Sequence, residues 1–363
     1  MTSQRSFLVV VCSAAGESDG AVHGYRFDPD ADRFRRQAST PLENPSFVAV
    51  HPDRRSLYAV ERVDGGVLAA FEFDDRTGAL GALNRKPSRG TGPCYVDVDP
   101  DGRVVTLANY QGGTVAAYPI EADGRLSDTC TVLEHEGSSV DSNRQREPHP
   151  HAARFGPENR FVYVPDLGTD CIESYRCASS DVISGTGCDE PPILEATANG
   201  VSIHEGAGPR HLDFHPDGRF AYVVNELDST VTVLERQSTT GELEPVHSVS
   251  TLPPAFDDDN TAADIHVHPT GRWVYATNRG HDSIAVFETD SSGNLLRPMD
   301  HVSARGRTPR TFTLAPNGEY LFVANQHGEN VVAYRIDADS GSLSAVASVT
   351  VQKPVCVEAL KLR

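Results

Sequence analysis

The sequence predicts an all-β protein: a seven-bladed β-propeller with four antiparallel strands in each blade. Three observations predict it: a repeat of roughly 50 residues, a turn signature inside each repeat, and chain ends that supply one further repeat. At 363 residues the chain exceeds the usual size of one ordinary domain, but a closed propeller of this length is a single unit. We therefore expect one domain over residues 1–363.

Six segments share the form Pro-x-x-apolar-x-apolar-x-Pro, followed by a short turn and a second β-rich run. NPSFVAVHPDRRSLYAVERV from Asn44 and TPRTFTLAPNGEYLFVANQ from Thr308 are two of them. Repeats of this kind at regular spacing indicate stacked structural units. The leading positions of the six are Pro45, Pro93, Pro150, Pro209, Ala262 and Pro309.

The second repeat illustrates the expected blade. Alternating apolar residues from Tyr95 predict an inner strand, and the turn Asp99–Arg103 follows, with Pro fixing φ and Gly supplying a permissive backbone. Further strands are predicted at Val104–Ala108 and Thr114–Pro119, with a weaker fourth at Asp128–Leu133. Four such strands in each repeat make one propeller blade.

The chain ends predict the seventh blade. KPVCVEAL from Lys353 matches only a first strand, and SFLVVVCS with AVHGYRFD from the N-terminal region match a second and a third. Residues 353–363 and 6–38 therefore form one blade, which pairs the last open edge of the ring. The segments His135–Pro148 and Cys177–Ala207 interrupt the repeat and are predicted to be surface loops.

Composition narrows the possible partners. Fifty-one acidic residues against 32 basic ones give a net charge of −19, which disfavours nucleic acids and anionic membranes as partners. No run of ~20 apolar residues is present to span a bilayer. An Asp-rich chain with only three Lys favours a halophilic-type acidic surface over an acidic patch for a basic partner. Seven Cys without a C-x-x-C spacing predict reduced thiols and a cytoplasmic location.

The repeat alignment also predicts a site. In each blade the start of the first strand and the end of the antiparallel second strand lie on the same face, near the axis. The residue after each leading position is Ser46, Cys94, His151, Arg210, Ala263 or Arg310. The second strands end with Glu61, Asn109, Asp166, Asn225, Asn278 or Asn325, each followed by Arg62, Tyr110, Leu167, Glu226, Arg279 or Gln326. Ionisable groups converging in a concave place predict a binding site.

Charge near the axis needs a partner or a ligand, so Arg210, Glu226 and Arg279 are the primary candidates. Asp166 and Asn278 either satisfy backbone groups at their turns or contact a ligand. The pair His149 and His151 resembles a metal clip, but no third ligand has a matching spacing, so we expect neither a metal nor a cofactor.

HPHAARFGPENRFVYVPDLGTD, GPRHLDFHPDGRFAYVVNELDSTV, ADIHVHPTGRWVYATNRGHDSIAVF and TPRTFTLAPNGEYLFVANQ resemble the seven-bladed lactonase family over essentially the whole chain. That family includes bacterial 6-phosphogluconolactonase and the fungal 3-carboxy-cis,cis-muconate lactonising enzyme. The resemblance implies a catalytic set of His151 (or His149), Arg210, Glu226 and Arg279. To these we add a substrate-binding set: His149, Asp166, Arg310, Asn278 and Gln326.

Lactone hydrolysis needs a base for water and a cation for the developing oxyanion. Glu226 or His151 can be the base, and Arg210 with Arg279 can hold an anionic group. No G-x-S-x-G motif is present to support a serine nucleophile. We expect a monomeric hydrolase of a small anionic lactone, most simply 6-phosphogluconolactone. The alternatives are a muconate-type cycloisomerase and a non-catalytic propeller that binds a protein partner.

Overall fold

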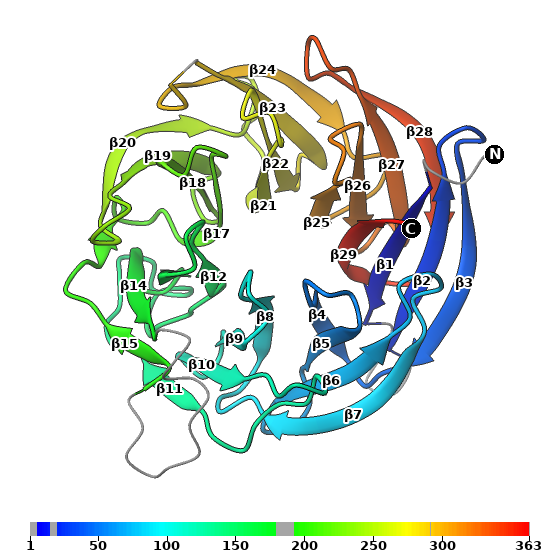
Figure 1. The fold of residues 1–363 in the computed structure, drawn as a ribbon. Coiled ribbons are helices and arrows are strands. Elements are labelled where there is room, and N and C mark those ends of the chain that lie inside the picture. The colour runs from blue at the N-terminus through cyan, green and yellow to red at the C-terminus, as the bar shows by residue number, and fades with distance from the viewer. Residues whose placement is uncertain (1–5, 15–19, 179–191, 291, 363) are drawn as a thin grey trace.

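Seven antiparallel sheets stand around a central axis in this computed structural model of the chain (Figure 1). The structure describes residues 6–362 except 15–19, 179–191 and 291. We number the sheets as blades 1 to 7, with blade 1 beginning at β4. The arrangement confirms the predicted seven-bladed β-propeller.

The strands of blades 1 to 3 are β4 (Pro45–Val50), β5 (Ser56–Glu61), β6 (Val67–Phe73), β7 (Leu80–Pro87); β8 (Pro93–Val98), β9 (Val104–Asn109), β10 (Thr114–Pro119), β11 (Thr131–Glu134); and β12 (Arg154–Phe155), β13 (Phe161–Asp166), β14 (Cys171–Cys177), β15 (Leu194–Ala196), β16 (Val201–Ser202). Those of blades 4 to 6 are β17 (Pro209–Phe214), β18 (Phe220–Asn225), β19 (Thr230–Arg236), β20 (Leu243–Ser250); β21 (Thr261–Val267), β22 (Trp273–Arg279), β23 (Ser283–Thr289), β24 (Leu296–Ser303); and β25 (Pro309–Leu314), β26 (Tyr320–Asn325), β27 (Asn330–Ile336), β28 (Leu343–Thr350). Blade 7 contains β29 (Pro354–Lys361), β1 (Phe7–Ser13), β2 (Ala21–Asp28) and β3 (Arg33–Pro41).

Blade 7 joins the two ends of the described chain, as predicted. Its strand order is β29-β1-β2-β3, and β1 pairs antiparallel with β29 from Phe7 opposite Lys361 to Cys12 opposite Cys356. The blade's outer strand ends at Pro41 rather than at residue 38, because β3 pairs with β2 over its whole length. No edge of the ring is left unpaired at this junction.

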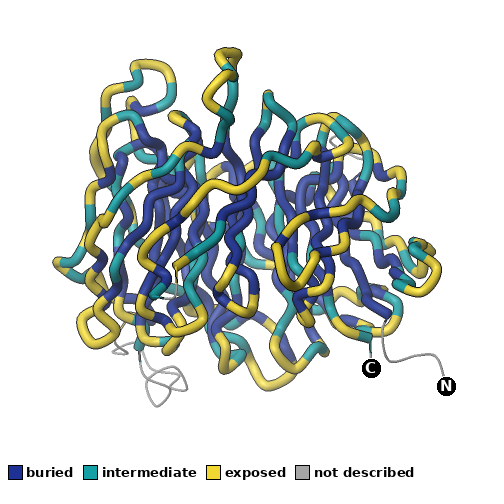
Figure 2. The backbone as a smooth tube through the Cα atoms, turned by 90° about the horizontal axis from the view of Figure 1, so that it is seen from above, coloured by how far each residue is buried: buried dark blue, intermediate teal, exposed yellow. Residues whose placement is uncertain are grey.

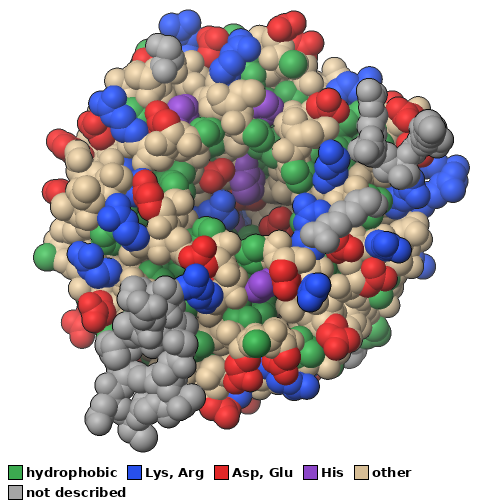
Figure 3. Space-filling view, viewed as in Figure 1, with side chains coloured by type: hydrophobic (Ala, Val, Ile, Leu, Met, Phe, Trp, Pro, Cys, Tyr) green, Lys and Arg blue, Asp and Glu red, His purple; other side chains and the backbone are tan. Residues whose placement is uncertain are grey.

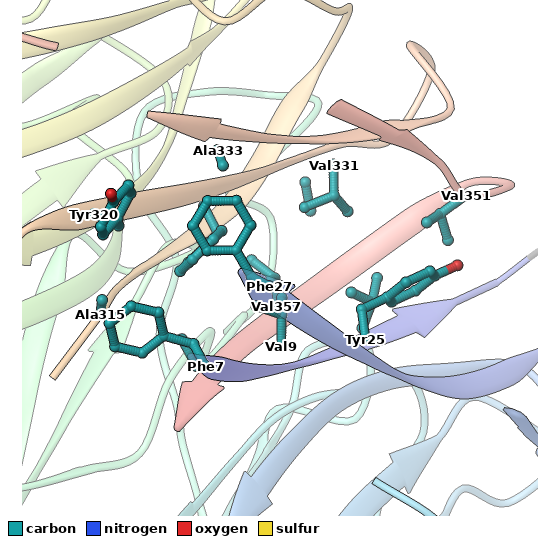
Figure 4. Packing of buried hydrophobic residues seen from close by; sticks show 14 residues of the cluster. Phe7, Val9, Tyr25, Phe27, Ala315, Tyr320, Val331, Ala333, Val351 and Val357 are labelled. Carbon is teal, nitrogen blue, oxygen red and sulfur yellow. The ribbon is translucent and has the colours of Figure 1, made fainter. Parts of the chain in front are cut away.

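Apolar layers between the blades hold the ring together. Alternate residues of a strand face opposite sides of the sheet, so β1 contributes Phe7 and Val9 to the layer toward blade 6 and Leu8 to the layer toward blade 1. Figure 4 shows the first of these layers, in which aromatic side chains of blade 7 pack against blade 6. The rings of Phe27 and Phe322 meet edge to face with centroids 5.2 Å apart.

The turn after each inner strand also links neighbouring blades. The residue two positions after the turn Pro has a left-handed backbone conformation, as at Gly102 (φ 71°) and Gly318 (φ 74°). The His that precedes the turn Pro of the preceding blade contacts this glycine: His51 Nε2 lies 2.9 Å from the Gly102 carbonyl, and His268 Nε2 lies 2.9 Å from that of Gly318. A side chain on either glycine would collide with the imidazole. The recurring His residues therefore join the turns of neighbouring blades.

Two local predictions need correction. The fourth strand of blade 2 is Thr131–Glu134 rather than Asp128–Leu133. The segment Cys177–Ala207, predicted to be a surface loop, contains β15 and β16, which pair with β14 as the outer strand of blade 3 in two pieces. Only residues 179–191 of this segment lie outside the described part of the chain.

The inner strands all begin on one face of the disc, and the second strands end there, so that Pro209 lies opposite Asn225 and Pro309 opposite Asn325. Both chain ends leave from the other face, where the Leu362 amide donates to the Ser6 carbonyl (Figure 2). Within the described residues there is no helix that could cross a membrane.

Candidate functional site

A single buried carboxylate lies at the centre of the predicted site, held by three guanidinium groups. Glu226 Oε2 lies 3.0 Å from Arg210 Nε and 2.8 Å from Arg279 Nη2, while Oε1 accepts a hydrogen bond of 2.6 Å from Arg144 Nη2. The Arg210 contact is an ion pair without hydrogen-bond alignment, since the Nε hydrogen has no well-aimed acceptor. The structure thus brings together Arg210, Glu226 and Arg279, as the sequence predicted.

Local backbone irregularities aim the inner-strand side chains at the axis. The pairing of β17 with β18 slips between Pro209 and His211, so Arg210 is the extra residue of a β-bulge. The same slip occurs at Arg310 in β25 and at Cys94 in β8. Because a bulged residue is released from the ladder and re-aimed, the residue after each leading position can point into the channel.

Arg144 belongs to this charge cluster, but the repeat alignment does not predict it. It comes from the segment His135–Pro148, which was predicted as a surface loop of possible functional use but without a named residue. The turn at Asp141 accepts the backbone amides of Asn143 and Arg144, which fixes the loop tip over the site. Arg144 also donates to the Tyr110 hydroxyl at 3.1 Å. No repeat equivalent marks this position, so only its place in the insertion His135–Pro148 could have drawn attention to it.

The charges of this group are strongly coupled. Burial acts to raise the pKa of Glu226, but the guanidiniums of Arg279, Arg210 and Arg144 outweigh it and hold the pKa well below its usual range. Burial, with Arg279 and Arg310 nearby, lowers the pKa of Arg210 to about 9. The Glu226 carboxylate is therefore ionised but is a weak proton acceptor at neutral pH.

Two imidazoles flank Tyr110 beside this cluster. His149 stacks on the Tyr110 ring at 4.4 Å, and its Nδ1 donates to the Tyr110 carbonyl at 2.8 Å. His151 is buried, and its Nδ1 lies 3.9 Å from Cys94 Sγ. Burial and the charge of Arg210 lower the pKa of His151 well below its ordinary value. Its ring is therefore neutral at physiological pH.

A cleft of about 430 Å³ opens on this face next to the carboxylate cluster. Arg310 and Gln326, both predicted to bind substrate, line it together with Arg62 and Lys353. Burial, followed by the charges of Arg279 and Arg62, lowers the pKa of Arg310 to about 10. The cleft is within the ~300–1,000 Å³ typical of small-molecule sites.

Asn278 and Asp166, the other two residues of the predicted substrate-binding set, are occupied by the protein itself. Asn278 is inaccessible to solvent, and its amide donates to the Thr251 carbonyl at 2.7 Å. The Asp166 carboxylate, equally buried, accepts from the His149 amide at 2.7 Å and contacts His135 Nδ1 at 2.7 Å. Both side chains thus hold the rim of the site rather than face the cleft.

Metal ligation has no support in the described part of the chain, which contains no group of three or more His, Cys, Asp or Glu able to hold an ion. His149 and His151 point to different partners, as described above, and do not form a clip. The arrangement therefore offers several cations and the neutral imidazole of His151, which suit an anionic, carbonyl-containing ligand.

Comparison of the sequence with known proteins also indicates a lactonase. The family model described as "Lactonase, 7-bladed beta-propeller" matches residues 8–359. A 6-phosphogluconolactonase of Bacillus subtilis is 36% identical over 350 residues, covering 95% of each chain. A 6-phosphogluconolactonase of Pectobacterium carotovorum is 33% identical over 317 residues, covering 87% of this chain and 88% of its own.

Solved structures are similar over nearly the whole length. A proposed 6-phosphogluconolactonase from Bacteroides fragilis superposes with a TM-score of 0.90 at 30% identity, covering 99% of both chains. The periplasmic gluconolactonase of Pseudomonas aeruginosa superposes with a TM-score of 0.89 at 30% identity, covering 98% of this chain and 99% of its own. With the propeller, its axial site and these matches in agreement, the chain belongs to the seven-bladed β-propeller lactonase family.

Proposed function

We propose that the protein hydrolyses a sugar lactone that carries an anionic group, with 6-phosphogluconolactone as its substrate. The observation that carries the proposal is the excess of cations at the axial face. Arg144, Arg210, Arg279 and Arg310 gather around one carboxylate in a protein whose net charge is −19. Such a site attracts small anions electrostatically. The names of the relatives from Bacillus subtilis and Pectobacterium carotovorum support the same substrate.

The reaction requires water to add to the lactone carbonyl. We assign the proton acceptor to His151, because its imidazole is neutral and forms no ion pair with a described residue, whereas three guanidiniums bind the Glu226 carboxylate. The water proton passes to the imidazole as the C–O bond to hydroxide forms. The tetrahedral oxyanion then collapses, the ring C–O bond breaks, and the departing alkoxide takes the proton back to give the open hydroxy acid.

Arg279 is placed to stabilise the oxyanion. Its Nη2 is bound to Glu226 and to the Ala262 carbonyl, whereas its buried Nε has no hydrogen-bond partner among the described groups. Arg279 lies near Arg310, which lines the cleft, and a donor with an unused hydrogen supplies the charge stabilisation that acyl transfer needs. Glu226 fixes this guanidinium and that of Arg210 rather than acting as the base.

The test is acid release from 6-phosphogluconolactone, corrected for the spontaneous rate, by the wild type and by Arg279→Lys. The lysine keeps the charge but cannot both contact Glu226 and present a second N–H in a fixed plane. We expect a loss of roughly 10²–10³ in kcat, the usual worth of an oxyanion donor. Wild-type protein that does not exceed the spontaneous rate would reject the function, and an unaffected variant would reject the role of Arg279.

A further inference from the structure

The cations of the axial face fall into two groups that differ in their partners. Arg144, Arg210 and Arg279 share the carboxylate of Glu226. Arg62, Arg310 and Lys353 line the adjoining cleft, and none of these three forms an ion pair with a described residue. We call this second group the free cation set.

The position of the free cation set makes its lack of partners informative. Arg62 and Arg310 are half-buried at the axis rather than extended into solvent. In a chain with 51 acidic and 32 basic residues, three cations beside one another without a carboxylate are an exception. Bringing like charges together is unfavourable unless an anion joins them, most of all for the half-buried Arg62 and Arg310. The lowered pKa of Arg310 is consistent with this proximity of positive charges, because burial, Arg279 and Arg62 all lower it.

Three different blades supply the set, which therefore depends on the closed ring. Arg62 follows β5 of blade 1, Arg310 is the bulged residue of β25 in blade 6, and Lys353 precedes β29 of blade 7. Lys353 has a left-handed backbone, with φ at 38°, which is uncommon for a residue with a long side chain. Gln111 and Gln326 add amide groups to the same wall of the cleft.

We propose that the free cation set is the subsite for the phosphate group of the substrate, and that it sets the preference for a phosphorylated over an unphosphorylated lactone. Arg guanidiniums bind phosphate oxygens in a fork, Lys adds a compact charge, and the amides donate to the remaining oxygens. The lactone ring then extends toward Arg279 and His151. This assignment rests on the proposed function, and it places phosphate recognition on residues other than the Glu226 cluster.

The first measurement is the ratio of kcat/KM for 6-phosphogluconolactone to that for glucono-1,5-lactone. Each of Arg62→Gln, Arg310→Gln and Lys353→Gln should lower this ratio by roughly 10- to 100-fold, because a charge-assisted hydrogen bond contributes about 1.5–3 kcal/mol. The loss should fall mainly on KM for the phosphorylated substrate. Arg35→Gln, on the exposed outer strand β3, removes an equal charge away from the cleft and should leave the ratio unchanged.

The second measurement uses inorganic phosphate and needs no turnover. Phosphate should bind the wild type in calorimetry and raise its melting temperature, and each of the three variants should weaken that binding while Arg35→Gln does not. An unchanged ratio with unchanged phosphate binding would overturn the subsite. Phosphate binding that depends on the three cations, in a protein that hydrolyses neither lactone, would keep the anion site and reject the lactonase activity. Lys353→Gln is the safest variant for folding, since its side chain is exposed.

Discussion

The two ends of the central channel carry opposite arrangements of charge. At the end described above, three guanidiniums share one buried carboxylate, and three further cations line the adjoining cleft. Toward the other end, the fourth residue after each leading position forms a second ring: Ala49, Asp97, Arg154, Asp213, His266, Thr313 and Glu358. Their signs alternate from blade 2 to blade 5. Arg154 contacts Asp97 at 3.9 Å and Asp213 at 3.4 Å, and His266 lies 3.6 Å from Asp213.

The carboxylates of this second ring also bind backbone amides of the next blade. Asp97 accepts from Phe155 at 3.2 Å and Asp213 from Val267 at 2.9 Å, while the neighbouring Asp264 accepts from Phe312 at 2.9 Å. Only a cavity of about 40 Å³ remains among them. Figure 3 looks onto this face and shows acidic, basic and His side chains gathered in the hollow at the axis.

The two ends of the channel thus differ in whether their charged side chains are paired within the protein or are available to bind a ligand. Alternating signs with backbone partners satisfy one another, so the second ring joins the inner strands and needs no ligand. Like charges without partners require an anion from outside the protein. The two ends therefore respond differently to substitution, and the following predictions use that difference.

The largest expected effect concerns two imidazoles, the buried His151 and the half-buried His266. Burial and Arg210 keep His151 neutral, whereas Asp264 and Asp213 overcome burial and raise the pKa of His266 to about 10. His151→Gln should lower the rate of lactone hydrolysis by roughly 10²–10⁴ while the protein stays folded. His266→Gln should cost stability with little change in the rate of the folded protein. Equal rate losses in both variants would remove the distinction.

The assignment of His151 as the base also predicts how the rate of lactone hydrolysis depends on pH under acidic conditions. A base with a lowered pKa stays unprotonated as the pH falls, so the rate above the spontaneous reaction should persist well below pH 6.5. His149→Gln is the matched variant, because His149 and His151 both contact the ring of Tyr110. If His149→Gln, rather than His151→Gln, abolishes turnover, the proton acceptor is His149.

The next effect is on folding stability at the site end. Glu226→Gln leaves Arg210, whose side chain is 1% exposed, without its counter-charge. We expect a loss of about 3–5 kcal/mol in the free energy of unfolding, as for other broken buried pairs. Denaturant unfolding at pH 7 measures it, and phosphate should restore part of the loss by occupying the cation-rich site. A variant as stable as the wild type that turns over slowly would show instead that Glu226 is the base.

At the end of the channel that carries the second ring, we expect a smaller effect on the free energy of unfolding, and in the opposite direction. Burial raises the pKa of Glu358 to about 7, and the adjacent ring positions are the uncharged Thr313 and Ala49. The folded state therefore holds its proton more tightly than the unfolded state, so this residue's contribution to stability is lost as the pH rises through 7. Glu358→Gln should stabilise the protein by about 1–3 kcal/mol at pH 8 and have little effect near pH 4. A stability loss at pH 8 would mean that the carboxylate has a partner in the ring.

Salt should give the smallest effect. With a net charge of −19, self-repulsion is screened on going from low to molar sodium chloride, and the melting temperature should rise by roughly a few degrees. Because the site end attracts anions, phosphate should act at lower concentrations than chloride does. A melting temperature that is flat in both salts would reject the prediction of a halophilic-type acidic surface.

The repeat made most of the fold predictable, because each blade repeats the same turn and the same period-two strands. It also placed Arg210, Glu226, Arg279 and Arg310 on one face, since antiparallel pairing fixes where strands begin and end. The β-bulge that aims Arg210 is invisible in sequence, since nothing in GPRH marks a slipped register. Arg144 was missed for a different reason: it lies in an insertion, where no repeat supplies a geometric reference. Asn278 differs again, because its residue type could not show whether its amide faces a ligand or the Thr251 backbone.

The shared blade has a consequence for how the protein is made. β1 to β3 are synthesised first, yet their inner strand β29 is synthesised last, and the Ser13 hydroxyl finally donates to the Gln352 carbonyl across 339 residues. A growing chain can complete blades 1 to 6 in order while blade 7 waits with an open edge on β1. Lys353, which enters the cleft beside β29, arrives at the same moment. The ring and its full set of site cations are therefore completed together, once β29 has left the ribosome.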